Sequence, residues 1–304
     1  MRTRWISTFG AVCLFLAGHT FAQQAVFPEV KTRFSKSPTD RVLVDKSADL
    51  ILDDGARQLV VKSPDRPLSV GYDAIHKVVF DVSTHMRGGA LSQIVGGVAG
   101  AVIASQHVND YWCYLEYMDK GGTVQPYMIE ISKESSPNLI EKMRTVFAEK
   151  VTVTEFTEKS EPVEKSTVKE LQSKHDLKVD KKNHPMPEIK PGQALLVVVA
   201  PPLAARFSGK GVQMKLHAND RVVAVNKQGT YNLVYLDPGD YLLVSQAGNA
   251  GGFRMTLEAG KDYYLLQDTF TGMMKANTSL SRHSKELVMY ELNGANLSNW
   301  TQKK

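Results

Sequence analysis

The chain has 304 residues, of which 37 are basic and 32 acidic, and its formal net charge is +5. So small an excess of basic residues gives no indication of nucleic-acid binding, which normally shows as a clustered basic face. At roughly 100 to 200 residues per domain, a chain of this length is expected to form two domains, each large enough to bury its own hydrophobic core.

Residues 1–22 have the pattern of an export signal peptide. Arg2 and Arg4 give a positive start, residues 11–17 form a short apolar run, and Ala22 is the small residue before the expected cleavage. This apolar run is too short to cross a bilayer, which takes about 20 residues. Cys13 does not stand at a lipoprotein processing site, so we expect a soluble mature chain in the periplasm or the extracellular space.

Cleavage would remove two arginines and no acid, which leaves 35 basic and 32 acidic residues and a net charge of +3. The mature chain would keep one cysteine, Cys113. An intramolecular disulfide is therefore excluded, and stability must come from the burial of apolar side chains.

Residues 40–153 show short apolar runs of period two, which predict strands. Hairpins are expected at the turn residues 53–55 and 119–122, where glycine allows a positive φ. The period then changes to that of an amphipathic helix, with Ser136 as a suitable N-cap and Pro137 at the first helical position. The apolar stripe of this helix consists of Leu139, Ile140, Met143, Val146 and Phe147.

Strands followed by one amphipathic helix, together with the strand "YWCYLEY", resemble the pleckstrin-homology-like (GRAM-like) barrel over residues 40–153. The resemblance implies a strongly bent sheet or barrel, with the C-terminal helix covering its open end.

Residues 154–192 differ in composition, since they are rich in Lys, Glu, Ser and Pro and poor in aromatic residues. Such a segment buries too little apolar area to offset the entropy of ordering it. We therefore expect a charged linker, with a short exposed helix in "TVKELQSKH". At the other end of the chain, residues 293–304 are expected to be a disordered tail that carries Trp300.

Strand patterns return over residues 193–292. The run "ALLVVVAPP" predicts a strand that is buried on both faces, and Asn219-Asp220 reads as a tight turn. In "YNLVYLDPGDYLLVSQ" two apolar strands flank a corner at Asp237-Pro238-Gly239. Five or six short strands at regular spacing favour a β-sandwich. The segment "SKELVMYELNG" that follows fits a strand and a helix equally well.

The turn at Asn219-Asp220, Tyr231, the Asp237-Pro238-Gly239 corner with Tyr241, and Ala259-Gly260 ahead of Tyr263-Tyr264 resemble a bacterial family of secreted domains of unknown function. That family has a prealbumin-like or carboxypeptidase-regulatory-like β-sandwich. The resemblance implies this fold and an envelope or extracellular setting, but no activity. Asp237, Pro238, Gly239 and Tyr241 are therefore interpreted as a fold signature and not as a site.

No motif predicts catalysis, a cofactor or a bound metal. The sequence has no G-x-S-x-G elbow, and Cys113 lies in the middle of a predicted strand, as is typical of an inert buried cysteine. Asp237 and Asp240 flank a turn, where carboxylates are solvated. The mature histidines show no metal-binding spacing and are interpreted as solvated surface residues: His76, His85, His107, His175, His184, His217 and His283.

One segment has no obvious structural explanation. Residues 88–105 contain no charge, and Gly96, Gly100 and Ala104 lie four residues apart, a spacing that lets another backbone approach closely. The run could be a glycine-rich helix packed inside the first domain or a mobile loop between strands, and we favour a packed segment, because so many glycines in an isolated helix are costly. The alternative is a contact surface for lipid or a partner, formed by Gly96, Gly97, Gly100 and Ala104.

These patterns predict a mainly β, two-domain protein that is exported and is not an enzyme. It would act as a binding or structural module of the cell envelope and recognise an envelope protein or polymer through sandwich loops and sheet edges. A first alternative is association with lipid or membrane through residues 88–105. A second is a hydrolase whose loop site shows no motif. The oligomeric state does not follow from the sequence.

Overall fold

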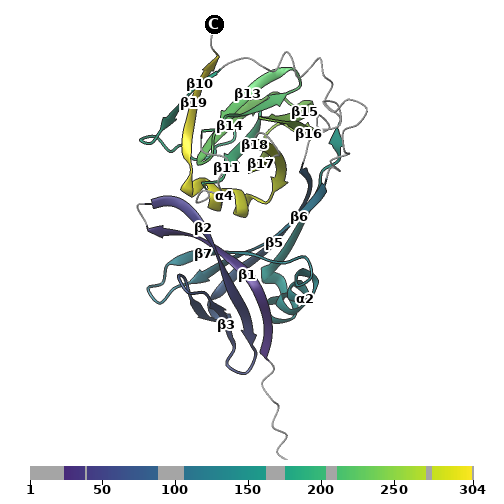
Figure 1. Ribbon diagram of the computed structural model, residues 1–304. Helices are drawn as coiled ribbons and strands as arrows, with labels where there is room; N and C mark the ends of the chain where they lie inside the picture. Colours follow the sequence, from purple (N-terminus) through teal and green to yellow (C-terminus); the bar gives the residue numbers. More distant parts are fainter. Residues whose placement is uncertain are drawn as a thin grey trace, which may run out of the picture.

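The structure, a computed structural model, describes residues 24–37, 40–87, 106–161, 175–202, 211–271 and 276–302. As predicted, the fold is mainly β, with three sheets and two α-helices among these residues (Figure 1). One sheet comes from the N-terminal part of the chain, and the remaining strands form the two other sheets.

The N-terminal sheet, here called the first sheet, has eight strands in the order β4-β3-β2-β1-β7-β6-β5-β8. Neighbouring strands are antiparallel, except that β5 and β8 are parallel. Short 3-10 turns, η1 (Tyr72–Ala74) and η2 (Ala148–Lys150), precede β5 and β8. The strands are β1 (Gln24–Ser37), β2 (Asp40–Asp53), β3 (Gln58–Lys62), β4 (Leu68–Gly71), β5 (Ile75–Arg87), β6 (Gln106–Met118), β7 (Val124–Glu130) and β8 (Val151–Thr157).

Both predicted hairpins of this sheet are confirmed, and an aspartate organises each turn. Asp53 Oδ1 accepts a hydrogen bond from the Ala56 amide at 2.9 Å between β2 and β3. Between β6 and β7, Asp119 Oδ1 accepts from the amides of Gly121 and Thr123, both at 2.9 Å. These bonds offer the backbone a local partner where the sheet ladder ends.

The predicted helix is α2 (Ser136–Phe147), and its apolar stripe closes the core of the first sheet. Leu139, Met143 and Phe147 are buried, and the Phe147 ring meets Tyr72 edge-to-face at 5.1 Å. The N-cap is Ser135, one residue before the predicted Ser136, and its side chain makes no cap hydrogen bond. Packing of the stripe therefore stabilises this helix more than capping does.

The first sheet extends beyond the predicted limits of residues 40–153 at both ends. Strand β1 begins at Gln24, and β8 takes up residues 154–157, which we had expected in the linker. In β8, Val151 and Val153 pack against the core on one side of a period-two pattern. The charged residues that follow mask this pattern when the segment is judged by average composition.

The other two sheets face each other as a β-sandwich. One sheet has the order β10-β19-β14-β11-β17-β18 and the other β13-β12-β15-β16-β9. Apolar side chains from both sheets form the core between them, among them Leu196, Leu216 and Phe253. The strands are β9 (Ser160–Glu161), β10 (His175–Asp180), β11 (Ala194–Ala200), β12 (Met214–Ala218), β13 (Arg221–Asn226), β14 (Thr230–Leu236), β15 (Gly239–Gln246), β16 (Ala250–Leu257), β17 (Asp262–Thr271), β18 (Ala276–His283) and β19 (Asn296–Gln302).

Strand β11 is buried on both faces, as its continuous apolar run predicts. Leu196 and Val198 point into the sandwich core. Leu195, Val197 and Val199 belong instead to a cluster that includes Trp112 and Met128 of the first sheet. Because side chains alternate between the two faces of β11, this strand contributes to two apolar cores.

The ambiguous segment after β18 is a helix, α4 (Lys285–Gly294), and it lies between the first sheet and the sandwich (Figure 1). The side chain of Ser284 caps it by accepting from the Leu287 amide. Leu287, Val288 and Leu292 are buried in the same cluster as Trp112 and Met128. The helix therefore bridges the two parts of the molecule.

Two further expectations about disorder are wrong where the structure describes the chain. Part of the expected linker forms β9 and β10, and part of the expected tail forms β19. Strands β10 and β19 pair with each other from His175↔Gln302 to Asp180↔Leu297, and the rings of His175 and Trp300 lie 5.4 Å apart. Each segment is too polar to order alone, but each satisfies the backbone of the other. Residues 162–174, which hold most of the expected short helix, lie outside the described residues.

Candidate functional site

A pocket of about 360 Å³ opens at one end of the sandwich, and its lining is mostly polar. The turn between β12 and β13 contributes Asn219, Asp220 and Arg221. The corner between β14 and β15 contributes Tyr235, Leu236, Asp237 and Tyr241, and Gln193 and Ala218 complete the lining. The pairing of β12 with β15, with Ala218 opposite Leu243, brings these two turns together.

The Asn219 turn is held by a reciprocal pair of hydrogen bonds. The Asn219 amide donates to the carbonyl of Leu242, and Asn219 Oδ1 accepts from the Leu242 amide, both at 2.9 Å. Asn219 has a φ of 56°, a left-handed conformation that asparagine tolerates better than most residues. The turn that presents Asp220 and Arg221 is therefore tied to the strand that follows the corner.

The corner is fixed in a similar way. The hydroxyl of Tyr241 donates to the carbonyl of Asp237 at 2.9 Å, which closes a loop over Pro238 and Gly239. Gly239 has a φ of 153°, and a side chain there would be strained. Of the predicted fold signature, Asp237 and Tyr241 line the pocket, so these residues serve both the fold and the candidate site.

The Tyr235 ring is oriented by the segment before β11. Its hydroxyl donates to the carbonyl of Glu188 at 2.9 Å, and the Lys190 ammonium lies 3.9 Å from the ring centre. These contacts anchor a described part of the expected linker to the sandwich.

Three charged side chains stand at the mouth of the pocket. Asp220, Arg221 and Asp237 are all exposed. Within the described ranges, none of the three forms an ion pair. Their polar ends are therefore presented to solvent from a backbone that hydrogen bonds hold in place.

A second hollow, of about 530 Å³, is lined by α2 alone, so no other element contributes groups to it.

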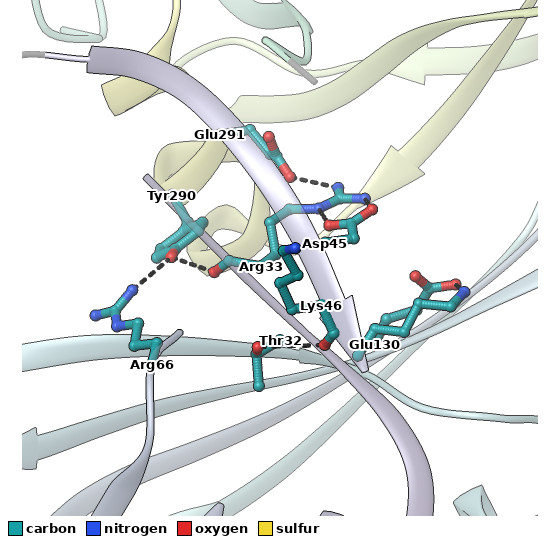
Figure 2. Close-up of polar contacts among 9 residues, drawn as sticks. Thr32, Arg33, Asp45, Lys46, Arg66, Glu130, Tyr290 and Glu291 are labelled. Atoms are coloured by element: carbon teal, nitrogen blue, oxygen red, sulfur yellow. Dashed lines mark hydrogen bonds and ion pairs between the residues drawn. The ribbon is translucent and has the colours of Figure 1, made fainter. Parts of the chain in front are cut away.

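A second polar cluster lies at the junction of the first sheet and α4, and Figure 2 shows Arg33 between two carboxylates. Arg33 Nε and Nη2 donate to Asp45 at 2.7 and 3.0 Å, and Nη1 donates to Glu291 Oε1 at 2.6 Å. The guanidinium also lies 4.2 Å from the centre of the Trp112 ring. This pairing joins β1 to α4, across 258 residues of sequence.

The charges of this cluster are not equally well compensated. Burial opposes the charge on Arg33, but Glu291 and Asp45 outweigh burial and raise the pKa of the guanidinium. Burial raises the pKa of Glu291 as well, because this side chain is fully buried and shares Arg33 with Asp45. Glu291 Oε2 has no hydrogen-bond partner among the described residues. The hydroxyl of Tyr290 adds a bond to the carbonyl of Arg33 at 2.5 Å (Figure 2).

A third cluster has the order of groups found in serine hydrolases. Ser281 Oγ lies 2.9 Å from His283 Nε2, and His283 Nδ1 lies 2.8 Å from Asp81 Oδ1. The second oxygen of Asp81 accepts from the Ser284 amide at 2.5 Å. Burial opposes protonation of His283, but Asp81 outweighs it and raises the pKa of the imidazole.

The burial of this third cluster favours a structural role. Ser281 and Asp81 are 1% exposed and His283 is 2% exposed, whereas a catalytic serine must reach its substrate. The cluster ties β5 to β18 and to the start of α4. Sequence reasoning missed both buried clusters. Ser281 and His283 share a face of one strand, but nothing local identifies Asp81 as their partner.

The single mature cysteine is buried as predicted. Cys113 is fully buried, and burial raises the pKa of its thiol.

The expectation of solvated histidines is wrong for several of them: His85, His175, His217 and His283 are buried. Burial lowers the pKa of His217 to about 4, and its Nε2 lies 3.3 Å from Gln246 Oε1. In the described part of the chain, no group of three or more ligand-type side chains has a geometry for metal binding.

The predicted contact surface at Gly96, Gly97, Gly100 and Ala104 lies outside the described residues, as do residues 1–22. Among the helices that the structure describes, none is long and apolar enough to cross a membrane.

No protein-family model matches the chain, and no curated protein matches it.

Proposed function

We propose that this protein is a non-catalytic, exported binding or structural module of the cell envelope, and that the pocket between the Asn219 turn and the Asp237 corner is its recognition site. The observation that carries this proposal is the convergence of Asp220, Arg221 and Asp237 around one pocket whose backbone is tied down by hydrogen bonds. Fixed polar groups around a small pocket are what selective recognition requires.

Binding is favoured over catalysis by where the ionisable groups lie. The two polar clusters around Arg33 and around His283 are buried and join parts of the fold. The carboxylates of the pocket are exposed on turns, where water screens them. Among the described residues that line the pocket there is no serine, threonine, cysteine, lysine or histidine, and its hydroxyl groups are those of tyrosines that donate to carbonyls within the fold.

The junction between the first sheet and the sandwich supports the same role. Ion pairs cross it from α4 and from β18, and an apolar cluster crosses it through α4 and β11. A recognition site on a preorganised platform loses less conformational entropy on binding. The exported setting is supported by the predicted signal peptide at residues 1–22 and by the resemblance of the C-terminal strands to a family of secreted domains with a prealbumin-like sandwich.

The proposal is tested by co-sedimentation of the mature chain, residues 23–304, with purified envelope fragments. The pocket variant is Asp220→Ala with Arg221→Ala, which removes one charge of each sign. The control variant is Lys133→Ala with Glu134→Ala, which removes the same charges from an exposed adjacent pair in the first sheet's connection to α2. We expect the wild-type and control proteins to sediment with the fragments and the pocket variant to remain in solution. Equal sedimentation of the pocket and control variants, or none of the wild type, would overturn the proposal.

A further inference from the structure

The charges at the pocket select against an anionic ligand. Asp220 and Asp237 would repel an anion, and Arg221 compensates only one of the two carboxylates that border the same hollow. A ligand that both donates and accepts hydrogen bonds satisfies carboxylates and a guanidinium together. Gln193 adds an amide, which also does both.

The aromatic side chains of the pocket are held in a fixed orientation. The hydroxyl groups of Tyr235 and Tyr241 donate to carbonyls of the protein itself, to Glu188 and Asp237. The rings are thereby held in place, so the mostly polar lining loses little conformational entropy when a ligand binds. A ligand that carries many hydroxyl groups complements such a lining.

The volume of the pocket is suited to binding one small unit of a longer molecule. A volume of about 360 Å³ is at the lower end of the range of roughly 300–1,000 Å³ for ligand pockets. The pocket lies at the end of the sandwich and opens to solvent, so a polymer could continue outward from a bound unit.

We infer that the pocket binds an uncharged, hydroxyl-rich sugar unit of a polysaccharide, with Asp220 and Asp237 accepting from its hydroxyl groups and Arg221 donating to them. This inference rests on the proposed function and names the ligand class of that site. A protein partner is the competing occupant.

Native gel electrophoresis with polysaccharide in the gel tests the ligand class directly. The probes are three uncharged polymers, dextran, hydroxyethyl cellulose and glycol chitin, and one anionic polymer, alginate. We expect at least one uncharged polymer to retard the mature protein, and alginate not to retard it. Retardation by alginate alone, or by none of the four, would overturn the inference.

Substitutions in the pocket test the roles of its side chains. Asp220→Asn with Asp237→Asn keeps the shape of both turns but weakens acceptance from hydroxyl groups, and should reduce retardation at least tenfold in apparent affinity. Tyr235→Leu should also weaken retardation, because it removes the ring, whereas Tyr235→Phe, which keeps the ring but loses its bond to Glu188, should weaken it less. Circular dichroism melting identifies any variant that fails to fold. The Lys133→Ala, Glu134→Ala protein is the control, and equal retardation of it and the Asn variant would refute the site.

The two proposals fail in different ways. If envelope fragments are bound through the pocket but no polysaccharide retards the protein, the sugar inference falls and a protein ligand is favoured. If neither envelope fragments nor polysaccharides bind, both the sugar inference and the proposed recognition function are refuted.

Discussion

Replacement of Arg33 by methionine should cost about 3–5 kcal/mol of unfolding free energy, because it leaves a buried carboxylate without its cation. Glu291 is fully buried, and Asp45 is only 14% exposed at its side chain, so water compensates neither group well. The substitution also removes the guanidinium that lies over Trp112. Methionine keeps an unbranched apolar stem, so the loss of packing is kept small.

Replacement of Glu291 by glutamine should cost much less, about 1 kcal/mol. The amide oxygen still accepts from Arg33 Nη1, and Arg33 keeps both bonds to Asp45. The change also removes a charge whose second oxygen has no partner in the described part of the chain. The structure thus predicts a strong asymmetry between the two partners of one ion pair.

Urea unfolding at pH 7, followed by tryptophan fluorescence, measures both changes. The mature chain has two tryptophans, Trp112 in the first sheet and Trp300 in the sandwich, so each part has a reporter. The control is Arg57→Met, which removes an arginine from an exposed pair with Asp73 and should change stability little. If Arg33→Met costs no more than this control, or no more than Glu291→Gln, the assigned role of the cluster is wrong.

Four further outcomes are expected. Asp81 raises the pKa of His283 in the folded state, so the stabilisation is complete below about pH 6.5 and is lost as the pH rises through the folded pKa. Urea titrations from pH 6 to 9 should show this loss, and Asp81→Asn should flatten it. Leu139→Ala should cost about 2–5 kcal/mol in the same assay, because this side chain is fully buried between α2 and the first sheet. In liposome flotation, neither the mature protein nor a form without residues 88–105 should float, and flotation of the former alone would favour the lipid alternative. Ser281→Ala should leave any hydrolysis of p-nitrophenyl acetate unchanged, whereas a loss of such hydrolysis would restore the enzyme alternative.

Much of the fold could be predicted because its signals are local. The hairpins at Asp53 and Asp119, the stripe of α2 and the double burial of β11 all follow from spacing within one segment. Strands β10 and β19 could not be predicted in this way, since each is polar and is ordered by pairing with a segment more than 100 residues away. The choice of helix for α4 likewise depends on apolar partners in both parts of the molecule.

The candidate site was predictable only in pieces. The Asn219 and Asp237 segments were each read correctly as turns, from residue types that favour turns. That the two turns border one pocket follows from the pairing of β12 with β15, which no local pattern specifies. The Arg33 cluster was beyond reach for the same reason, because Glu291 follows 258 residues later.

Because α4 packs against both the first sheet and the sandwich, parts of the first sheet stay uncovered until α4 has been synthesised. Trp112 and Met128 of the first sheet are covered by a cluster that includes Leu287, Val288 and Leu292. A chain synthesised from its N-terminus therefore carries these apolar side chains, and the Arg33 cation, uncovered until α4 has been made. Long-range contacts of this kind slow folding and leave intermediates prone to aggregation. Truncation before Lys285 should yield an insoluble product even though every strand of the first sheet is present.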